Sequence, residues 1–277
     1  MTGSPARAHD PFENAKLTGY TRSGFAARYH AHRPRAPEAL VALLLQLGHM
    51  RHPKLVVDLG CGTGLSTVLW ATHADRVIGI EPLDEMRDIA VTGNSAPNVE
   101  FRDGVAQKTG LPDGSADVVT CSQSLHDMEP ESTMLEVDRI LRVGGVFAAY
   151  DYDVPPAVHP DAEAAFAALV RHVLDLRKQH GIRSAMQQWD KDEHVARLRH
   201  GGRFRYVKEV GLHHTEPCTA ERWVGFALTL GFVPPVLDLG LPESEIGLDE
   251  LRRVAAKTLG DRGLPWYVSY RVRIAIK

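Results

Sequence analysis

Short apolar segments alternate with helix-like segments along residues 54–153, and this alternation constrains the fold more than any other feature. The segments between the apolar runs, 64–74, 82–93 and 132–145, have the residue types and spacing of helices. Strands that alternate with helices of this length form βαβ units, whose right-handed crossovers place helices on both faces of a parallel sheet. We therefore predict a doubly wound α/β core. The predicted strands are KLVVDLG (54–60), RVIGIE (76–81), NVEFRDG (98–104), ADVVTCSQS (116–124) and VFAAYDYD (146–153).

The alternation stops after Asp153. A long amphipathic helix follows, so we predict an α-helical cap over residues 154–202. RFRYVKEVGLHHTE (203–216) and WYVSYRVRIAIK (266–277) return to a strand pattern. Residues 203–277 are therefore expected to complete the sheet, with an antiparallel strand at its edge.

Composition limits the classes of partner. Apolar residues make up 44% of the 277-residue chain and the net charge is −3, so we expect one soluble α/β domain with an insertion and no nucleic-acid partner. Cys61, Cys121 and Cys218 form no CxxC pair, which is typical of reduced thiols in the cytoplasm. No apolar run approaches the roughly 20 residues of a membrane span, and the scattered histidines match no ligand spacing. We expect a cytoplasmic protein without a membrane contact or a metal.

The stretch VVDLGCGTG (56–64) joins the first strand to the next segment and predicts a ligand site. Glycine-rich turns at this place let a nucleotide-like ligand approach the backbone. The dinucleotide pattern G-x-G-x-x-G would need a glycine at position 65, which is Leu65. Asp58 at the strand end would repel a pyrophosphate. A ligand with cationic groups and no phosphate, such as S-adenosylmethionine (SAM), suits the turn better.

This stretch resembles motif I of the class I SAM-dependent methyltransferases, and in particular the small-molecule methyltransferases of the ubiquinone/menaquinone C-methyltransferase group (type 11). The resemblance covers roughly residues 20–153. It implies a Rossmann-like, mostly parallel seven-stranded sheet with an antiparallel last strand. It also implies a SAM-binding core over 51–153 and an N-terminal helical lid over 1–50, where YHAHRPRAP (29–37) is similar to the family's Y-x-x-x-R-P-x-x-P.

The resemblance also implies which residues bind SAM. The Glu81 carboxylate would accept the ribose hydroxyls, although a Glu at a strand end also caps helices. Arg33 would pair with the methionyl carboxylate, and a solvated surface arginine is the alternative. Val105 and Gln107 replace acids often seen in the family's adenine-binding segment. The predicted SAM-binding residues are Tyr29, Arg33, Asp58, Gly60, Cys61, Gly62, Gly64, Glu81, Pro82, Gly104, Val105, Ala106, Ser122 and Gln123.

The acceptor site is predicted at the ends of the fourth and fifth strands. His126 is the candidate general base, or else a histidine that only shapes the pocket. Asp127, Tyr150 and Tyr152 are the predicted substrate-binding residues. Asp127 would orient His126 or cap the next turn, and the tyrosines would line the pocket or simply end a strand.

We therefore expect a monomeric or homodimeric enzyme that moves the methyl group of SAM to O, N or C of a small organic acceptor and releases S-adenosylhomocysteine (SAH). One alternative is an enzyme of the same fold that uses SAM as a bound cation in a cyclisation or rearrangement. A second alternative, an NAD-dependent oxidoreductase, is disfavoured by Leu65.

Overall fold

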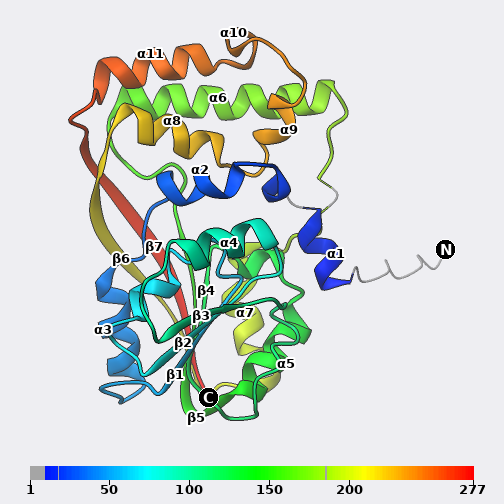
Figure 1. Cartoon of the computed structure of the whole chain (residues 1–277), viewed down its shortest axis with the longest axis vertical. Coiled ribbons are helices and arrows are strands. Elements are labelled where there is room, and N and C mark those ends of the chain that lie inside the picture. Colours follow the sequence, from blue (N-terminus) through cyan, green and yellow to red (C-terminus); the bar gives the residue numbers. More distant parts are fainter. Residues whose placement is uncertain (1–9, 18, 185) are drawn as a thin grey trace, which may run out of the picture.

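A seven-stranded sheet lies beneath a layer of helices in the computed structural model, which describes residues 10–17, 19–184 and 186–277 (Figure 1). The strand order is β3-β2-β1-β4-β5-β7-β6. β7 runs antiparallel to both of its neighbours, and the pairs from β3 to β5 are parallel. The predicted Rossmann-like sheet with its antiparallel last strand is confirmed. The strands are β1 (Leu55–Leu59), β2 (Arg76–Ile80), β3 (Val99–Arg102), β4 (Ala116–Ser122), β5 (Leu141–Tyr152), β6 (Tyr206–Cys218) and β7 (Leu264–Ile276).

Helices surround the sheet and extend above it. Among the described residues, none of them is both long and apolar enough to cross a membrane. They are α1 (Pro11–Lys16), α2 (Phe25–His32), α3 (Glu38–Leu47), α4 (Asp84–Thr92), α5 (Pro130–Ile140), α6 (Pro160–Gln179), α7 (His194–Arg199), α8 (Ala220–Leu228), α9 (Pro234–Leu237), α10 (Glu243–Ile246) and α11 (Leu248–Thr258). Single turns of 3₁₀ helix are η1 (Gly19–Thr21), η2 (Thr67–Trp70), η3 (Leu125–Asp127), η4 (Lys191–Glu193) and η5 (His200–Gly202).

Both faces of the central strands are buried, which explains their continuous apolar sequences. Val56 points into a cluster with residues of α3 and η2, and the next residue, Val57, points into a cluster with residues of α5 and α7. Both valines are fully buried. Because side chains alternate along a strand, a one-residue slip would exchange the two faces, so this burial fixes the strand register.

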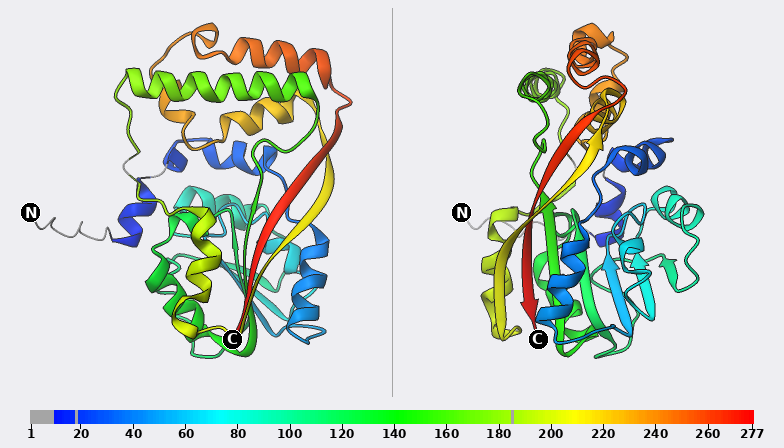
Figure 2. Two further views of the ribbon diagram at one scale, coloured as in Figure 1. Left: turned by 180° about the vertical axis from the view of Figure 1, so that it is seen from behind. Right: turned by 90° about the vertical axis from the view of Figure 1, so that its left-hand side faces the viewer.

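The upper layer contains α6, α8, α9, α10 and α11 (Figures 1 and 2). Its centre is aromatic: the ring of Phe166 lies 5.0 Å from that of Trp223, and the ring of Phe226 lies 5.1 Å from that of Trp266. The predicted cap, residues 154–202, contains α6 and α7, but only α6 belongs to this layer. α7 packs on β6 and β7, and the other helices of the layer come from residues 220–258. The domain boundaries at 50, 153 and 202 stay a prediction.

The long strands β6 and β7 join the layer to the sheet, and Figure 2 shows them running from one to the other. Trp266, near the start of β7, is buried with the helices, whereas Ile274 near its end is buried against the sheet. One apolar cluster therefore passes without interruption from α3 through the sheet to α11.

Two segments differ from the helix pattern of the sequence. Residues 64–74 hold only the 3₁₀ turn η2, because β-branched Thr67 and Val68 disfavour a helix and the Thr67 hydroxyl donates to Asp58 at 2.7 Å. α5 ends at Ile140 rather than near 145, and β5 begins at once. Gly144, with φ of +77°, lies in the irregular start of that strand, where the pairing with β4 shifts register.

Candidate active site

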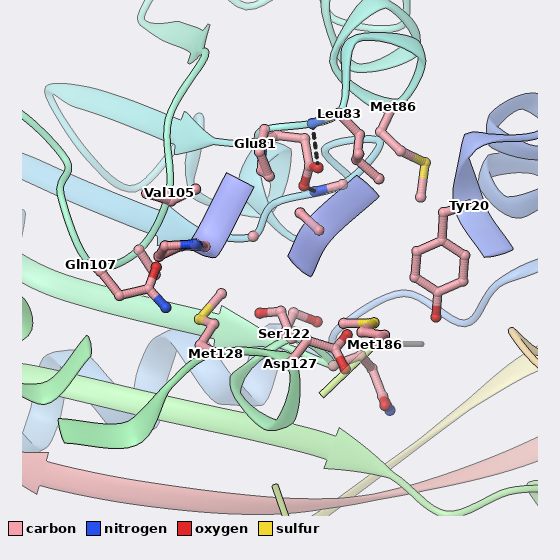
Figure 3. Close-up of a pocket in the computed structure, with 18 of the residues that line it drawn as sticks. Tyr20, Glu81, Leu83, Met86, Val105, Gln107, Ser122, Asp127, Met128 and Met186 are labelled. Atoms are coloured by element: carbon pink, nitrogen blue, oxygen red, sulfur yellow. Dashed lines mark hydrogen bonds between the residues drawn. The ribbon is translucent and has the colours of Figure 1, made fainter. Parts of the chain in front are cut away.

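A cleft opens where β1, β2 and β4 end. Figure 3 shows Glu81, Leu83 and Met86 on one side of it and Ser122, Asp127 and Met128 on the other. Crevices at the carboxyl ends of parallel strands are the usual ligand sites of such sheets. Ten of the predicted residues line this cleft: Tyr29, Gly60, Gly62, Glu81, Pro82, Val105, Ala106, Ser122, Gln123 and Asp127.

The glycine turn forms the floor of the cleft. Gly60 and Gly62 have φ of +63° and +56°, a region that favours glycine. A Cβ at position 60 would lie 2.7 Å from the Met128 methyl carbon and 2.8 Å from the Ser124 Cβ. The turn therefore needs glycine at position 60, for both its conformation and its close packing.

Glu81 supplies a carboxylate to the cleft wall. One oxygen accepts the Gly62 N–H at 2.8 Å and the other accepts the Leu83 N–H at 3.0 Å. Each oxygen keeps a lone pair for a further donor, such as a ribose hydroxyl. Burial raises the pKa of Glu81 to about 7, against the lowering effect of the two N–H groups.

Asp58 lies behind the turn and not on the cleft wall. Its carboxylate accepts the hydroxyls of Thr67 and Thr120 at 2.7 and 2.8 Å, and burial raises its pKa to about 6. Cys61, Gly64 and Gly104 are also absent from the wall. The geometry gives these four residues a supporting place, and their predicted SAM contact stays a prediction.

A second cavity adjoins the cleft. Arg33 and His126 line this cavity and not the cleft, together with Arg177 and Lys191. The residues that the two spaces share are Tyr20, Tyr29, Gln123, Asp127 and Met186. Gln123, which lines both spaces, has φ of +54°, a backbone conformation that is uncommon for residues other than glycine.

His126 and Asp127 differ in their electrostatics. The His126 Nε2 lies 3.3 Å from an Asp127 oxygen, and its Nδ1 lies 4.0 Å from one of Asp151. Burial, with the charge of Lys191, lowers the pKa of His126 to about 3, so its imidazole is neutral. Burial raises the pKa of Asp127 to about 6, although the Gln188 amide donates to its carboxylate at 2.8 Å.

Tyr150 and Tyr152 belong to the packed interior. Their exposed fractions are 1% and 6%, and neither lines the cleft or the second cavity. The Tyr152 hydroxyl accepts an N–H of Arg33 at 2.7 Å. Tyr152 can thus act on a ligand through Arg33, and direct substrate contacts by the two tyrosines stay a prediction.

No group of three or more His, Cys, Asp or Glu side chains in the described ranges could hold a metal ion.

Comparison with known proteins gives the family. Residues 57–149, which include the glycine turn, Glu81 and the end of β4, match the model of a family described as "Methyltransferase domain". Residues 57–149 are therefore a methyltransferase domain, and this match bears out the predicted class I SAM-dependent methyltransferase family for that part of the chain.

Relatives agree with this assignment. The chain is 25% identical over 154 residues to the uncharacterized methyltransferase YcgJ of Bacillus subtilis, which covers 54% of this chain and 58% of that protein. It is 30% identical over 147 residues to CRG1 of Saccharomyces cerevisiae, named as a probable SAM-dependent methyltransferase, over 51% of this chain and 50% of that one. The chain thus spans only about half the length of these relatives.

A solved structure from Anaeromyxobacter dehalogenans, named as a type II methyltransferase, has the same fold. Its TM-score is 0.60 at 23% identity, over 88% of this chain and 96% of that one.

Several residues of the cleft wall were not among the predicted site residues. Met86, Met128 and Met186 place thioethers around the cleft, and Tyr20 stands beside Tyr29. In the sequence, Met86 belongs to an amphipathic helix. The periodicity of such a helix predicts that Met86 is buried, but it does not distinguish the core from the wall of a ligand site. Pro11, Ala15 and Tyr20 precede the matched domain, where no motif marked them.

Proposed function

We propose that this methyltransferase transfers the methyl group of SAM, bound in the cleft, to a small organic acceptor held in the second cavity. The observation that carries the proposal is the shared wall: Gln123 and Asp127 line both spaces. Methyl transfer requires donor and acceptor to meet in line, which two adjoining cavities permit.

The cleft residues suit the parts of the nucleoside. Glu81 would accept the ribose hydroxyls, and Leu83, Met86 and Val105 provide an apolar slot for adenine. The methionyl portion would extend toward Ser122, Gln123 and Tyr29. Aromatic faces such as that of Tyr29 favour a sulfonium cation.

SAM supplies an activated methyl group, so the chain has to align the acceptor, exclude water and, where needed, take up a proton. A nucleophilic atom of the acceptor forms a bond to the methyl carbon while the carbon–sulfur bond breaks and leaves a neutral thioether. The acceptor proton would go to Asp127, whose pKa of about 6 makes it a better base than His126, with a pKa of about 3.

Calorimetry with SAH, SAM and NAD tests the proposal, followed by measurement of SAH formation with a panel of phenols, amines and carboxylic acids. We expect binding of SAH and SAM, none of NAD, and SAH release that depends on an acceptor. Binding of NAD without binding of SAH would overturn the proposal. Acceptor conversion that consumes no SAM would instead support a cyclisation or rearrangement.

A further inference from the structure

The guanidinium of Arg33 is buried without a carboxylate partner among the described residues. The residue is 8% exposed. Its N–H groups donate to the Thr229 hydroxyl at 2.9 Å, the Thr229 carbonyl at 2.5 Å and the Tyr152 hydroxyl at 2.7 Å, all neutral acceptors. Three of the five N–H donors of an arginine thus have acceptors among the described residues, and two are left. The guanidinium carbon also lies 4.6 Å from the ring centroid of Tyr29 and 5.3 Å from that of Phe226, so aromatic rings and no carboxylate face its charge. Buried cations are normally paired, because an uncompensated buried charge is costly.

Arg177 brings a second guanidinium to the same cavity. It lies in the last turn of α6, and its buried Nε has no hydrogen-bond partner in the described part of the chain. No ion pair joins it to an acid within the described ranges. A helix C-terminus favours a cation, which explains part of this placement but leaves the buried N–H unsatisfied.

The other charged groups of the cavity are more nearly balanced. The Lys191 ammonium lies 2.7 Å from an Asp151 oxygen, and the second Asp151 oxygen lies 2.5 Å from Arg273. Asp127 is the one acidic side chain among the described residues of this wall. Arg33 and Arg177 therefore leave the cavity with an excess of positive charge.

Apolar side chains form much of the remaining wall. Leu17, Val154, Leu230 and Phe232 line the cavity with the rings of Tyr20 and Tyr29. Such walls favour an aromatic or aliphatic body over a small hydrated ion.

We propose that the acceptor is an anion: a carboxylate or phosphate group on an apolar body, with the anionic group bound by Arg33 and Arg177. The inference rests on the proposed function, because it identifies the second cavity as the acceptor site. It also moves Arg33 from the methionyl carboxylate of SAM, its predicted partner, to the acceptor. Charge-assisted bonds to an anion would satisfy the N–H groups that the fold leaves open.

The test measures binding to protein saturated with SAH. The probes are para-hydroxybenzoate, phenyl phosphate and the neutral para-hydroxybenzamide. At least one anionic probe should bind about 10- to 100-fold more tightly than the amide, the range expected for hydrogen bonds to a charged group. The two anionic probes distinguish a carboxylate from a phosphate. Equal affinity of all three probes, or no binding at millimolar concentration, would overturn the inference.

Variants assign the preference to the two arginines. Arg33→Gln and Arg177→Gln should each remove most of the preference for the anion while SAH affinity stays within about threefold of wild type. Arg33→Lys should restore part of it. Arg171→Gln, on an exposed part of α6, is the matched control and should change neither affinity.

Thermal unfolding of each variant is measured first, because Arg33 also joins α2 to Thr229. If Arg33→Gln does not fold, Arg177→Gln decides the inference alone. A loss of SAH affinity in folded Arg33→Gln, with the anion preference kept, would return Arg33 to the methionyl carboxylate. Failure of SAH to bind wild-type protein would instead contradict the proposed function.

Discussion

Glu81 should make nucleoside binding depend on pH. Its pKa is raised to about 7, so below that pH the carboxyl is protonated and one of its oxygens can no longer accept freely. The affinity for SAH should therefore rise as pH increases from about 5 to about 8, by at most about tenfold per unit below the pKa. Calorimetry across this range measures the effect.

Glu81→Gln is the matched control for that dependence. The amide cannot ionise, so SAH affinity should fall by about 1.5–3 kcal/mol at pH 8 and vary little with pH. A pH dependence that survives in Glu81→Gln would assign it to another group.

Asp58 should matter for stability more than for affinity. Asp58→Ala removes the acceptor of two buried hydroxyls, and we expect the free energy of unfolding to fall by about 1–3 kcal/mol. Because burial raises the Asp58 pKa to about 6, the contribution of this residue is larger at low pH and decreases as pH rises through about 6. Urea unfolding of wild type and Asp58→Ala at about pH 4 and 7 measures the loss of stability and its pH dependence. If Asp58→Ala lowered the affinity for SAH as much as Glu81→Gln does, Asp58 would matter for binding and not mainly for stability.

The proton acceptor can be identified by comparing two variants. Asp127→Asn should lower turnover by about 10²-fold or more with an acceptor that loses a proton, whereas His126→Ala should cost less than about tenfold. In wild type the rate should rise with pH through about 6, the pKa of Asp127, because only its carboxylate takes up a proton. The rate of SAH release between pH 4 and 8 measures this dependence. If the rate stopped rising with pH in His126→Ala but still rose in Asp127→Asn, His126 would be the base.

At the scale of elements, the hydrogen bonds of Asn14 hold α1 at the rim of the cleft, beside the apolar contact of Ala15 with the cluster that includes Leu83 and Met86. Asn14, which is 5% exposed, donates to the Gln187 and Asp127 carbonyls at 3.2 and 3.4 Å and accepts the Gln187 N–H at 2.9 Å. Asn14→Ala should therefore release α1, speed hydrogen exchange in Pro11–Lys16 and weaken SAH binding several-fold. Lys16→Ala, on the exposed side of this helix, should do neither.

The predicted strands agree with the structure where burial dictates the sequence. Val56 and Val57 face different cores, so an unbroken apolar run was required there. The segment 64–74 was misjudged because its conformation depends on a bond from Thr67 to Asp58, which local periodicity does not contain. The predicted N-terminal lid shows a similar limit, because α1 is held at the rim by the long-range hydrogen bonds of Asn14 and the packing of Ala15. Residues 1–9 and 18 lie outside the described ranges, and closure of the lid over SAM stays a prediction.

In the candidate site, too, local sequence patterns predict some features, and contacts between distant segments determine others. The place of Glu81 on the cleft wall could be predicted from its position at the end of a strand, whereas its SAM contact stays a prediction. The separation of Arg33 from the cleft depends on how the end of α2 packs against Thr229. Contacts between segments so distant in sequence leave no local pattern. The supporting place of Asp58 likewise depends on Thr120, which lies in another strand.

At the scale of the whole molecule, sheet and helical layer should unfold together, because one apolar cluster runs through both. Trp223→Ala in α8 removes a fully buried ring from the layer and should lower the free energy of unfolding by about 3–5 kcal/mol. We expect one transition, with calorimetric and fluorescence midpoints coinciding. Lys257→Ala, exposed on α11, should shift the stability by less than about 0.5 kcal/mol. Two separate transitions in Trp223→Ala would show that the layer folds independently.

The second cavity takes most of its wall from outside residues 57–149: from the N-terminal helices, the segment before η4 and the loop after α8. If the second cavity holds the acceptor, as proposed, sequence change in those segments would alter the choice of acceptor and leave the glycine turn and Glu81 undisturbed. Related chains that share the matched domain could then differ in the compound that they methylate. Exchanging residues 220–237 together with the N-terminal segment between two such chains is a direct route to a changed acceptor preference.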